Sequence, residues 1–132
     1  MCRQINILML IMVSGPYRGG TNDDPTLIKN NLEKLEEFAL EIFNKGHVPI
    51  VGEWLALPLI KLAGSQKIGD EQWERIQYPI AHRMLEKCDA VLRIKGESKG
   101  ADQDVMIAKE RGLIIYYHID EIPTAGKSLT IK

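Results

Sequence analysis

The chain begins with an almost unbroken apolar run over residues 5–13, which contains neither glycine nor proline and stops at Ser14-Gly15-Pro16. Continuous rather than alternating hydrophobicity is typical of a strand that is covered on both faces. The run therefore predicts a buried central strand. Shorter apolar stretches predict further strands at His47–Val51, Ala90–Ile94 and Leu113–Tyr117, and residues 128–132 suggest a short edge strand.

Helical spacing separates these predicted strands. Asp24 precedes Pro25, which is the pairing of an N-cap with proline at the first helical position. Apolar residues then recur at steps of four and three until Lys45-Gly46, which predicts a helix with one buried stripe. The stripe consists of Ile28, Leu32, Leu35, Ala39 and Ile42.

Two more helices follow from the same periodicity. One is expected from Asp70 to about Lys87 with a kink at Pro79, and the other from Gly100 to Arg111, where Gly112 ends it. Residues 52–69 are apolar, but Pro58 should interrupt any long helix there. This segment therefore predicts a short helix and a loop.

Strands that alternate with helices favour a parallel sheet with helices on both faces. We expect one three-layer α/β domain over residues 1–132, with a mostly parallel sheet of four to five strands and a flavodoxin- or Rossmann-like arrangement. Ligands of such sheets bind in a crevice at the carboxyl ends of the strands. The segments Ser14–Asp24 and Lys95–Gly100 leave the first and third predicted strands, so function is expected there.

The composition agrees with a single domain and argues against some classes of binding partner. The chain has 132 residues, 45% of them hydrophobic, and 17 basic against 18 acidic side chains give a net charge of -1. A domain of this size needs no disulfide or structural metal, so the two cysteines should be reduced. The charge argues against extended DNA or RNA binding. The first apolar run is too short to span a membrane, and no cleavage site follows it, so the expected location is the cytosol.

The segment after the first strand has the composition of an anion-binding loop. Glycines let the backbone approach a ligand, Arg18 can bond phosphate or carboxylate oxygens, and a helix N-terminus follows. The alternative is a long turn with a solvated arginine. Neither Gly-Lys-Ser/Thr nor Gly-x-Gly-x-x-Gly is present, which disfavours bound ATP or NAD. The expected ligand contacts here are Ser14, Gly15, Tyr17, Arg18, Gly19 and Gly20.

A second set of residues carries a family resemblance. The chain combines a first strand ending in Ser-Gly-Pro, a Cys88-Asp89-Ala-Val strand, and the motif Ser98-x-Gly-Ala-x-x-acid-x-x-x-Ala-x-x-x-Gly. Together these motifs resemble the nucleoside 2-deoxyribosyltransferase superfamily. With Arg18-Gly19-Gly20 the closest branch resembles the 2'-deoxynucleoside 5'-phosphate N-hydrolases and their small bacterial relatives. The resemblance runs from about Ile5 to Tyr117.

The resemblance implies roles for particular residues. In the family a glutamate attacks the anomeric carbon of the sugar, and Asp104, one methylene shorter, stands at its position. Ser98 and Gly100, with Arg18, Gly19 and Gly20, would hold the 5'-phosphate. The family's second acid has no carboxylate counterpart in residues 78–83, where His82 could supply a proton. The implied double displacement needs neither an organic cofactor nor a metal.

Structural explanations remain open for several of these residues. Asp104 could complement the dipole of its helix, and Asp89 could orient the start of its strand instead of contacting a ligand. Cys88 has no catalytic partners of recognisable order and is expected to be a buried, inert thiol. No metal site is expected, because the histidines His47, His82 and His118 lack metal-ligand spacing.

The leading hypothesis is a nucleotide-binding protein that cleaves or transfers at the N-glycosidic bond of a nucleoside or its 5'-monophosphate. The alternative is a non-catalytic module that senses a nucleotide or nucleotide sugar and has lost the acid pair. A third hypothesis is a purely structural protein. Because a small core cannot bury every apolar side chain of Trp54–Leu62, we expect this segment to form the interface of a homo-oligomer.

Overall fold

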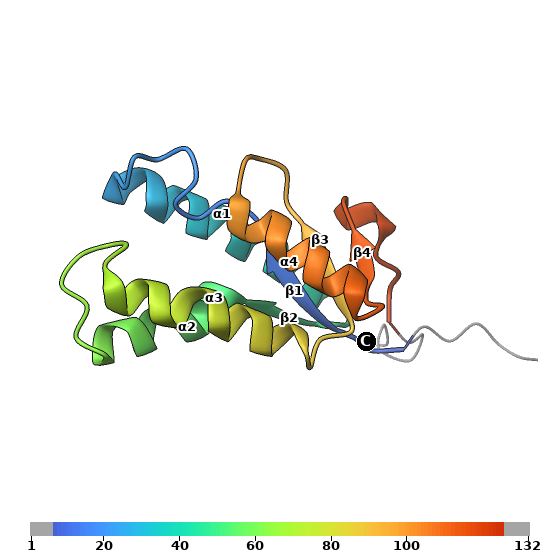
Figure 1. Cartoon of the computed structure of the whole chain (residues 1–132). Coiled ribbons are helices and arrows are strands. Elements are labelled where there is room, and N and C mark those ends of the chain that lie inside the picture. Colours follow the sequence, from blue (N-terminus) through green and yellow to red (C-terminus); the bar gives the residue numbers. More distant parts are fainter. Residues whose placement is uncertain (1–6, 126–132) are drawn as a thin grey trace, which may run out of the picture.

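Four parallel strands form one sheet within residues 7–125, the part of the chain that the computed structural model describes (Figure 1). The strand order is β2-β1-β3-β4, which is flavodoxin-like. The strands are β1 (Leu10–Ser14), β2 (Val48–Val51), β3 (Ala90–Arg93) and β4 (Ile114–Tyr116). The predicted parallel α/β sheet is thus confirmed, while the edge strand expected at 128–132 lies outside the described residues.

The central strand is shorter than its apolar run. Residues 11–13 are fully buried, as expected for a strand covered on both faces, but Ile7 and Leu8 are 77% and 53% exposed. The prediction of a strand from residue 5 is therefore wrong for residues 7–9. The reason lies in the neighbours, since β1 has strand partners only from Leu10, which pairs with Val48 of β2. A hydrophobic run without neighbouring strands gains no ladder of hydrogen bonds.

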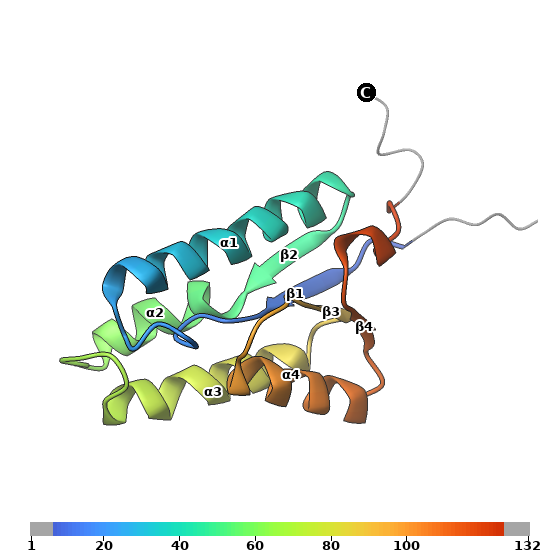
Figure 2. The same cartoon turned by 90° about the horizontal axis from the view of Figure 1, so that it is seen from above.

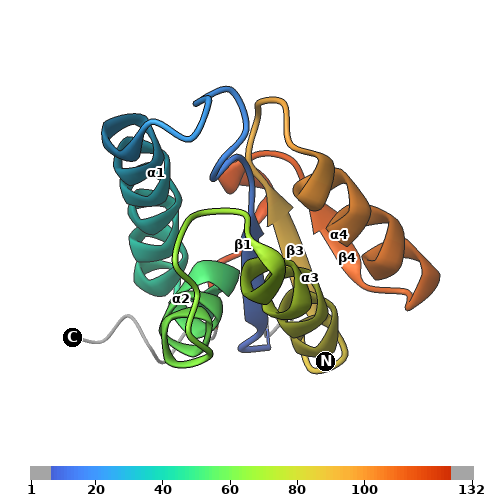
Figure 3. The ribbon, with the colours of Figure 1, turned by 60° about the vertical axis from the view of Figure 1, so that its left-hand side comes forward.

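Helices cover both faces of the sheet, as predicted (Figure 2). Helix α1 (Pro25–Asn44) packs on one face, together with the short 3-10 helix η1 (Ile119–Glu121). Helices α3 (Glu71–Leu85) and α4 (Lys99–Glu110) pack on the other face. Helix α2 (Gly52–Leu62) lies against α3 (Figure 3). The result is three layers, helix, sheet and helix.

The start of α1 follows the predicted chemistry. The Asp24 carboxylate accepts hydrogen bonds from the amides of Thr26 and Leu27, and Pro25 occupies the first turn. Of the predicted stripe, Ile28, Leu35, Ala39 and Ile42 are buried and Leu32 is partly buried. The N-cap and the apolar spacing therefore determine where this helix begins and which face it buries.

Proline does not interrupt the other helices. Helix α2 runs through Pro58 and α3 runs through Pro79. Residues 52–69 form the expected short helix and loop, but the helix ends at Leu62 and not at Pro58. Pro58 is exposed, so the carbonyl that loses its amide donor can bond to water. Packing of Ala56 and Ile60 into the core holds the remaining turns together.

Candidate functional site

A pocket of about 430 Å³ lies at the carboxyl ends of the strands. It lies between the β1–α1 loop, the β3–α4 loop, the first turn of α2 and the middle of α3. All the expected site residues line it except His82 and Asp89: Ser14, Gly15, Tyr17, Arg18, Gly19, Gly20, Ser98, Gly100 and Asp104. The fold therefore brings together two segments that are about eighty residues apart in sequence.

Asp104 forms the acidic floor of this pocket. Its side chain extends from α4 and is only 7% exposed, and Ser14 at the end of β1 donates a hydrogen bond of 2.8 Å to its Oδ2. Burial raises the pKa of Asp104 to about 6, although the Ser14 bond and nearby His82 lower it. A carboxyl group with this pKa changes its charge close to neutral pH.

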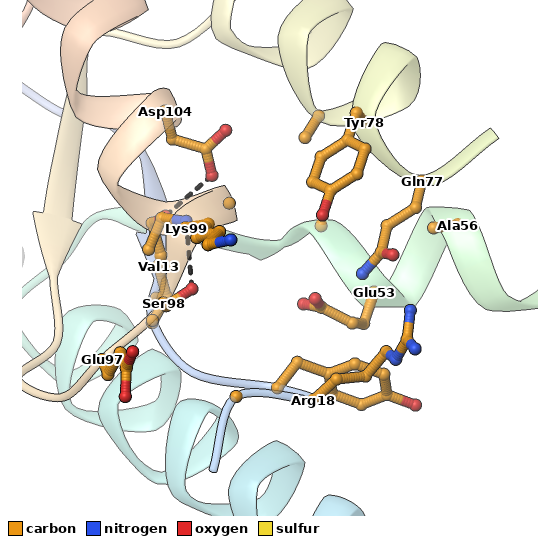
Figure 4. A pocket seen from close by; sticks show the side chains of 18 of the residues that line it. Val13, Arg18, Glu53, Ala56, Gln77, Tyr78, Glu97, Ser98, Lys99 and Asp104 are labelled. Atoms are coloured by element: carbon orange, nitrogen blue, oxygen red, sulfur yellow. Dashed lines mark hydrogen bonds between the residues drawn. The ribbon is translucent and has the colours of Figure 1, made fainter. Parts of the chain in front are cut away.

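A second carboxyl group in the pocket is one that sequence reasoning missed. Glu53, in the first turn of α2, directs its side chain into the pocket opposite Asp104 (Figure 4). Burial, together with the negative charge of Asp104, raises the pKa of Glu53 to about 7. The signal was its position directly after the second predicted strand and Gly52. The sequence analysis did not find Glu53, because it placed function only in the segments that follow the first and third predicted strands.

The β1–α1 loop places Arg18 at the rim of the pocket. Its Nε and Nη2 atoms donate to the Asp23 carboxylate at 2.9 and 3.1 Å, and its guanidinium lies 5.7 Å above the Trp73 ring. The bond with Asp23 raises the pKa of Arg18 and lowers that of Asp23. Both partners are partly exposed, so this ion pair contributes little stability and an incoming anion can compete for Arg18.

Tyr17 is a wall of the pocket and also part of the core. Its ring is nearly parallel to that of Trp73, with 6.3 Å between centroids, and it is 8% exposed. Burial raises the pKa of its hydroxyl. The Tyr17 ring therefore already has an aromatic partner, which limits how it can stack on a ligand.

The β3–α4 loop is organised by Arg93. Its guanidinium donates to the carbonyls of Ile94 and Gly96 and forms an ion pair of 2.7 Å with Asp102. These bonds fix the loop that leads into α4. Ser98 then caps the helix, since its Oγ accepts a hydrogen bond from the Ala101 amide.

Close backbone contacts explain some of the glycines in both loops. A Cβ atom at Gly19 would lie 2.5 Å from the Glu97 carbonyl oxygen, so the two loops can touch only because this side chain is absent. A Cβ atom at Gly100 would lie 3.2 Å from the Tyr78 ring. A Cβ atom at Gly15 would lie 2.7 Å from the Cβ of Ile94 instead. Gly15 therefore has a packing reason that is independent of any ligand.

His82 lies beside the pocket without lining it. Its Nε2 atom is buried and has no hydrogen-bond partner within the described residues, and its ring lies against that of Tyr78 at 6.5 Å between centroids. His82 acts on Asp104 electrostatically, because it lowers the pKa of that carboxyl. The geometry does not bring the imidazole to the place of a ligand.

Asp89 lies at the amino end of β3, on the opposite edge of the sheet from the pocket. Its Oδ2 accepts a hydrogen bond of 2.8 Å from the Leu10 amide, and its own amide donates to the Leu10 carbonyl at 2.9 Å. The geometry favours the alternative that Asp89 orients the starts of β1 and β3. The fold separates it from the other expected ligand contacts.

Two further side chains with reactive groups, Cys88 and His47, are buried and lie outside the pocket. Cys88 is a buried free thiol, and burial raises its pKa to about 11, as expected for an inert cysteine. His47 is also buried, with Nδ1 accepting from the Met9 amide and Nε2 bonded to the Pro123 carbonyl. It joins the two ends of the described chain.

Residues 7–125 contain neither a candidate metal site nor a candidate membrane-spanning helix. No group of three or more His, Cys, Asp or Glu side chains there could hold a metal ion. In the same residues, no helix has the length and hydropathy needed to cross a membrane.

Comparison with known proteins does not assign the chain to a family. No model of a known protein family, no curated protein and no solved structure matches the chain. The fold is therefore assigned from the strand order and helix placement of this molecule.

Proposed function

We propose that the pocket binds a nucleoside 5'-monophosphate, or the related nucleoside, and that the protein cleaves or transfers at its N-glycosidic bond. The observation that carries this proposal is Asp104, a buried carboxylate at the inner end of a pocket whose outer rim holds Arg18 and a helix N-terminus. A nucleophile for a sugar and contacts for an anion thus belong to one site.

The rim suits a phosphate group. Arg18 offers a guanidinium, and the first turn of α4 offers backbone amides at the positive end of the helix dipole. Ser98 Oγ accepts from the Ala101 amide, which leaves its hydroxyl hydrogen for a phosphate oxygen. Gly19 and Gly20 would let the β1–α1 loop approach the same group.

The inner end of the pocket suits the sugar. With a phosphate at the rim, the anomeric carbon would lie toward Asp104, whose Oδ atoms attack C1' while the base leaves. Water or a second base then attacks C1' and releases the aspartyl ester. The Ser14 bond holds the carboxylate in place, which matters because a displacement of about 1 Å can cost about a hundredfold in rate.

The motifs that resemble nucleoside 2-deoxyribosyltransferases support the same proposal. Ser14, Arg18, Ser98, Gly100 and Asp104 are scattered in sequence but line a single pocket. The roles that the resemblance implies for these residues require such a common pocket.

The test is base release from a panel of deoxyribo- and ribonucleoside 5'-monophosphates, followed by chromatography. We expect free base with at least one nucleotide, and its loss in Asp104→Ala with ligand affinity largely kept, because the carboxylate acts chiefly in the transition state. Glu110→Ala, an exposed carboxylate at the far end of α4, is the matched control and should behave as the wild type.

Absence of base release with every nucleotide would contradict the enzyme proposal. If the same nucleotides then raised the melting temperature, the non-catalytic sensing module would replace it. No effect of any nucleotide on activity or stability would contradict both.

A further inference from the structure

The proposed reaction needs a proton for the departing base, and we infer that Glu53 supplies it. This inference rests on the proposed function, and it assigns to the first turn of α2 the acid that the chain lacks in residues 78–83. Among the described residues that line the pocket, only Glu53 and Asp104 are carboxyl groups carried by helices, whereas Asp23 and Glu97 belong to the two loops.

The fold places Glu53 directly opposite the proposed nucleophile. Strand β2 ends at Val51, Gly52 begins α2, and Glu53 therefore stands at the same carboxyl edge of the sheet as Ser14. In Figure 4 its carboxylate enters the pocket from α2, while Asp104 enters from α4. A sugar between them would have one carboxyl group on each side, as glycosidic cleavage requires.

His82 is the competing proton donor, and its position argues against it. Its buried Nε2 atom has no contact with the pocket, and Tyr78 and Ala81, which do line the pocket, belong to the same part of α3. The Tyr78 ring lies against the imidazole. A ligand would meet these two side chains before it could reach His82.

The electrostatics of the pocket agree with this division of roles. Burial raises the pKa of both carboxyl groups, to about 6 for Asp104 and to about 7 for Glu53, and the charge of ionised Asp104 further favours the protonated form of Glu53. A general acid works best when its pKa lies near the working pH. The charged and titratable groups that share the pocket with Glu53 are Tyr17, Arg18, Asp23, Tyr78, Glu97, Lys99 and Asp104.

The reaction balances with these two groups and one water. An Oδ atom of Asp104 forms a bond to C1', the bond from C1' to the base nitrogen breaks with its electron pair going to the base, and the Glu53 proton neutralises the base. Ionised Glu53 then takes a proton from water as the water oxygen bonds to C1'. The ester bond to Asp104 breaks, and both carboxyl groups return to their starting states.

Leaving-group chemistry distinguishes a proton donor from a residue that only shapes the pocket. The experiment compares Glu53→Gln with wild type on the best nucleotide of the panel and on a counterpart whose base leaves without protonation. That counterpart is the N7-methylated form of a purine nucleotide or the 5-nitro form of a pyrimidine nucleotide. His82→Gln is measured beside it, and thermal melting checks that each variant is folded.

We expect Glu53→Gln to lower kcat about a hundredfold or more on the ordinary nucleotide and less than threefold on the activated one. His82→Gln should change both substrates by the same factor. The wild-type kcat should fall above about pH 7 on the ordinary nucleotide only. The same fall should persist in His82→Gln, which excludes the imidazole as its source even if Glu53→Gln does not fold.

Two results would overturn the role of Glu53 while leaving the proposed function intact. One is an equal loss on both substrates, and the other is a Glu53→Gln enzyme with unchanged kcat on the ordinary nucleotide. Failure of the wild type to release base from either substrate would instead overturn the proposed function, and the role of Glu53 with it.

Discussion

Asp104 is a residue whose burial directly changes its chemistry, because burial raises the pKa of its carboxyl group. An ionised carboxylate away from water is costly, and here one hydroxyl, that of Ser14, donates a direct hydrogen bond to it. The folded protein therefore favours the protonated acid more than water does, which is why its pKa rises to about 6. A buried carboxyl group of this kind reduces stability at the pH where it is charged.

This cost has a definite sign with pH. Because the folded pKa lies above the ordinary value of 3.8, the contribution of Asp104 to stability is complete below about pH 4 and is lost as the pH rises through 6. Asp104→Asn should therefore raise the free energy of unfolding by about 3 kcal/mol at pH 8 and by only about half as much at pH 5. Chemical denaturation at the two pH values measures the difference.

Ser14→Ala gives the complementary control. It removes the donor to the charged carboxylate, so it should destabilise the protein more at pH 8 than at pH 5. An Asp104→Asn protein that is less stable than wild type at pH 8 would show that the ionised carboxylate is well compensated in the fold.

At the scale of elements, the site depends on two loops that touch. The β1–α1 loop and the β3–α4 loop meet where Gly19 faces the Glu97 carbonyl, and Arg93 fixes the second loop from below. Neither loop alone forms a pocket. Their separation is set by parallel pairing of β1 with β3, in register from Ile11 opposite Ala90.

Substitution of Gly19 by Ala tests this contact. Since the new Cβ would lie 2.5 Å from a backbone oxygen, the loops must separate, and we expect a loss of about 1–3 kcal/mol in the free energy of unfolding. Any nucleotide-induced rise in melting temperature should also shrink. Gly64→Ala is the control, because nothing lies within 4 Å of its Cβ and only its positive φ of 90° opposes the change.

The two variants should therefore differ in how far a nucleotide raises their melting temperature. Gly64→Ala is expected to cost about 1 kcal/mol and to keep the full nucleotide effect. Equal nucleotide effects in Gly19→Ala and wild type would contradict a pocket formed by the contact of the two loops.

At the scale of the whole molecule, α2 carries more apolar surface than the core uses. Ala56 and Ile60 are buried, but Leu55 and Leu59 are 40% and 44% exposed and Leu62 is 83% exposed. Trp54 is partly exposed too, and its Nε1 donates to Glu36 of α1 at 2.8 Å. Such a surface is typical of an interface, in line with the homo-oligomer expected from residues 54–62.

We therefore expect the protein to elute as a dimer at micromolar concentration in light-scattering chromatography. Leu59→Lys should shift it toward the monomer, because a buried, unpaired ammonium opposes association. Met106→Lys replaces an exposed apolar side chain on α4 and should leave the dimer intact. A monomeric wild type at tens of micromolar would contradict this use of α2.

The sequence by itself determined the elements and their order. Uninterrupted apolar runs mark the strands, period-3.6 stripes and the Asp24-Pro25 cap mark the helices, and their alternation implies a parallel sheet with a crevice at its carboxyl ends. These signals are local, or nearly so, and each depends on a few neighbouring residues. For the same reason Ser14, Arg18 and Ser98 could be assigned to the crevice from their place after a strand.

Only the tertiary structure decided which side chains share the pocket. It brought Glu53 opposite Asp104, kept His82 behind Tyr78 and placed Asp89 at the far edge of the sheet. In the tertiary structure, the pairing of β1 with its neighbours begins only at Leu10, and two helices continue through a proline. These outcomes depend on contacts between segments far apart in the chain, on burial and on the charge of neighbours, none of which a local sequence pattern contains.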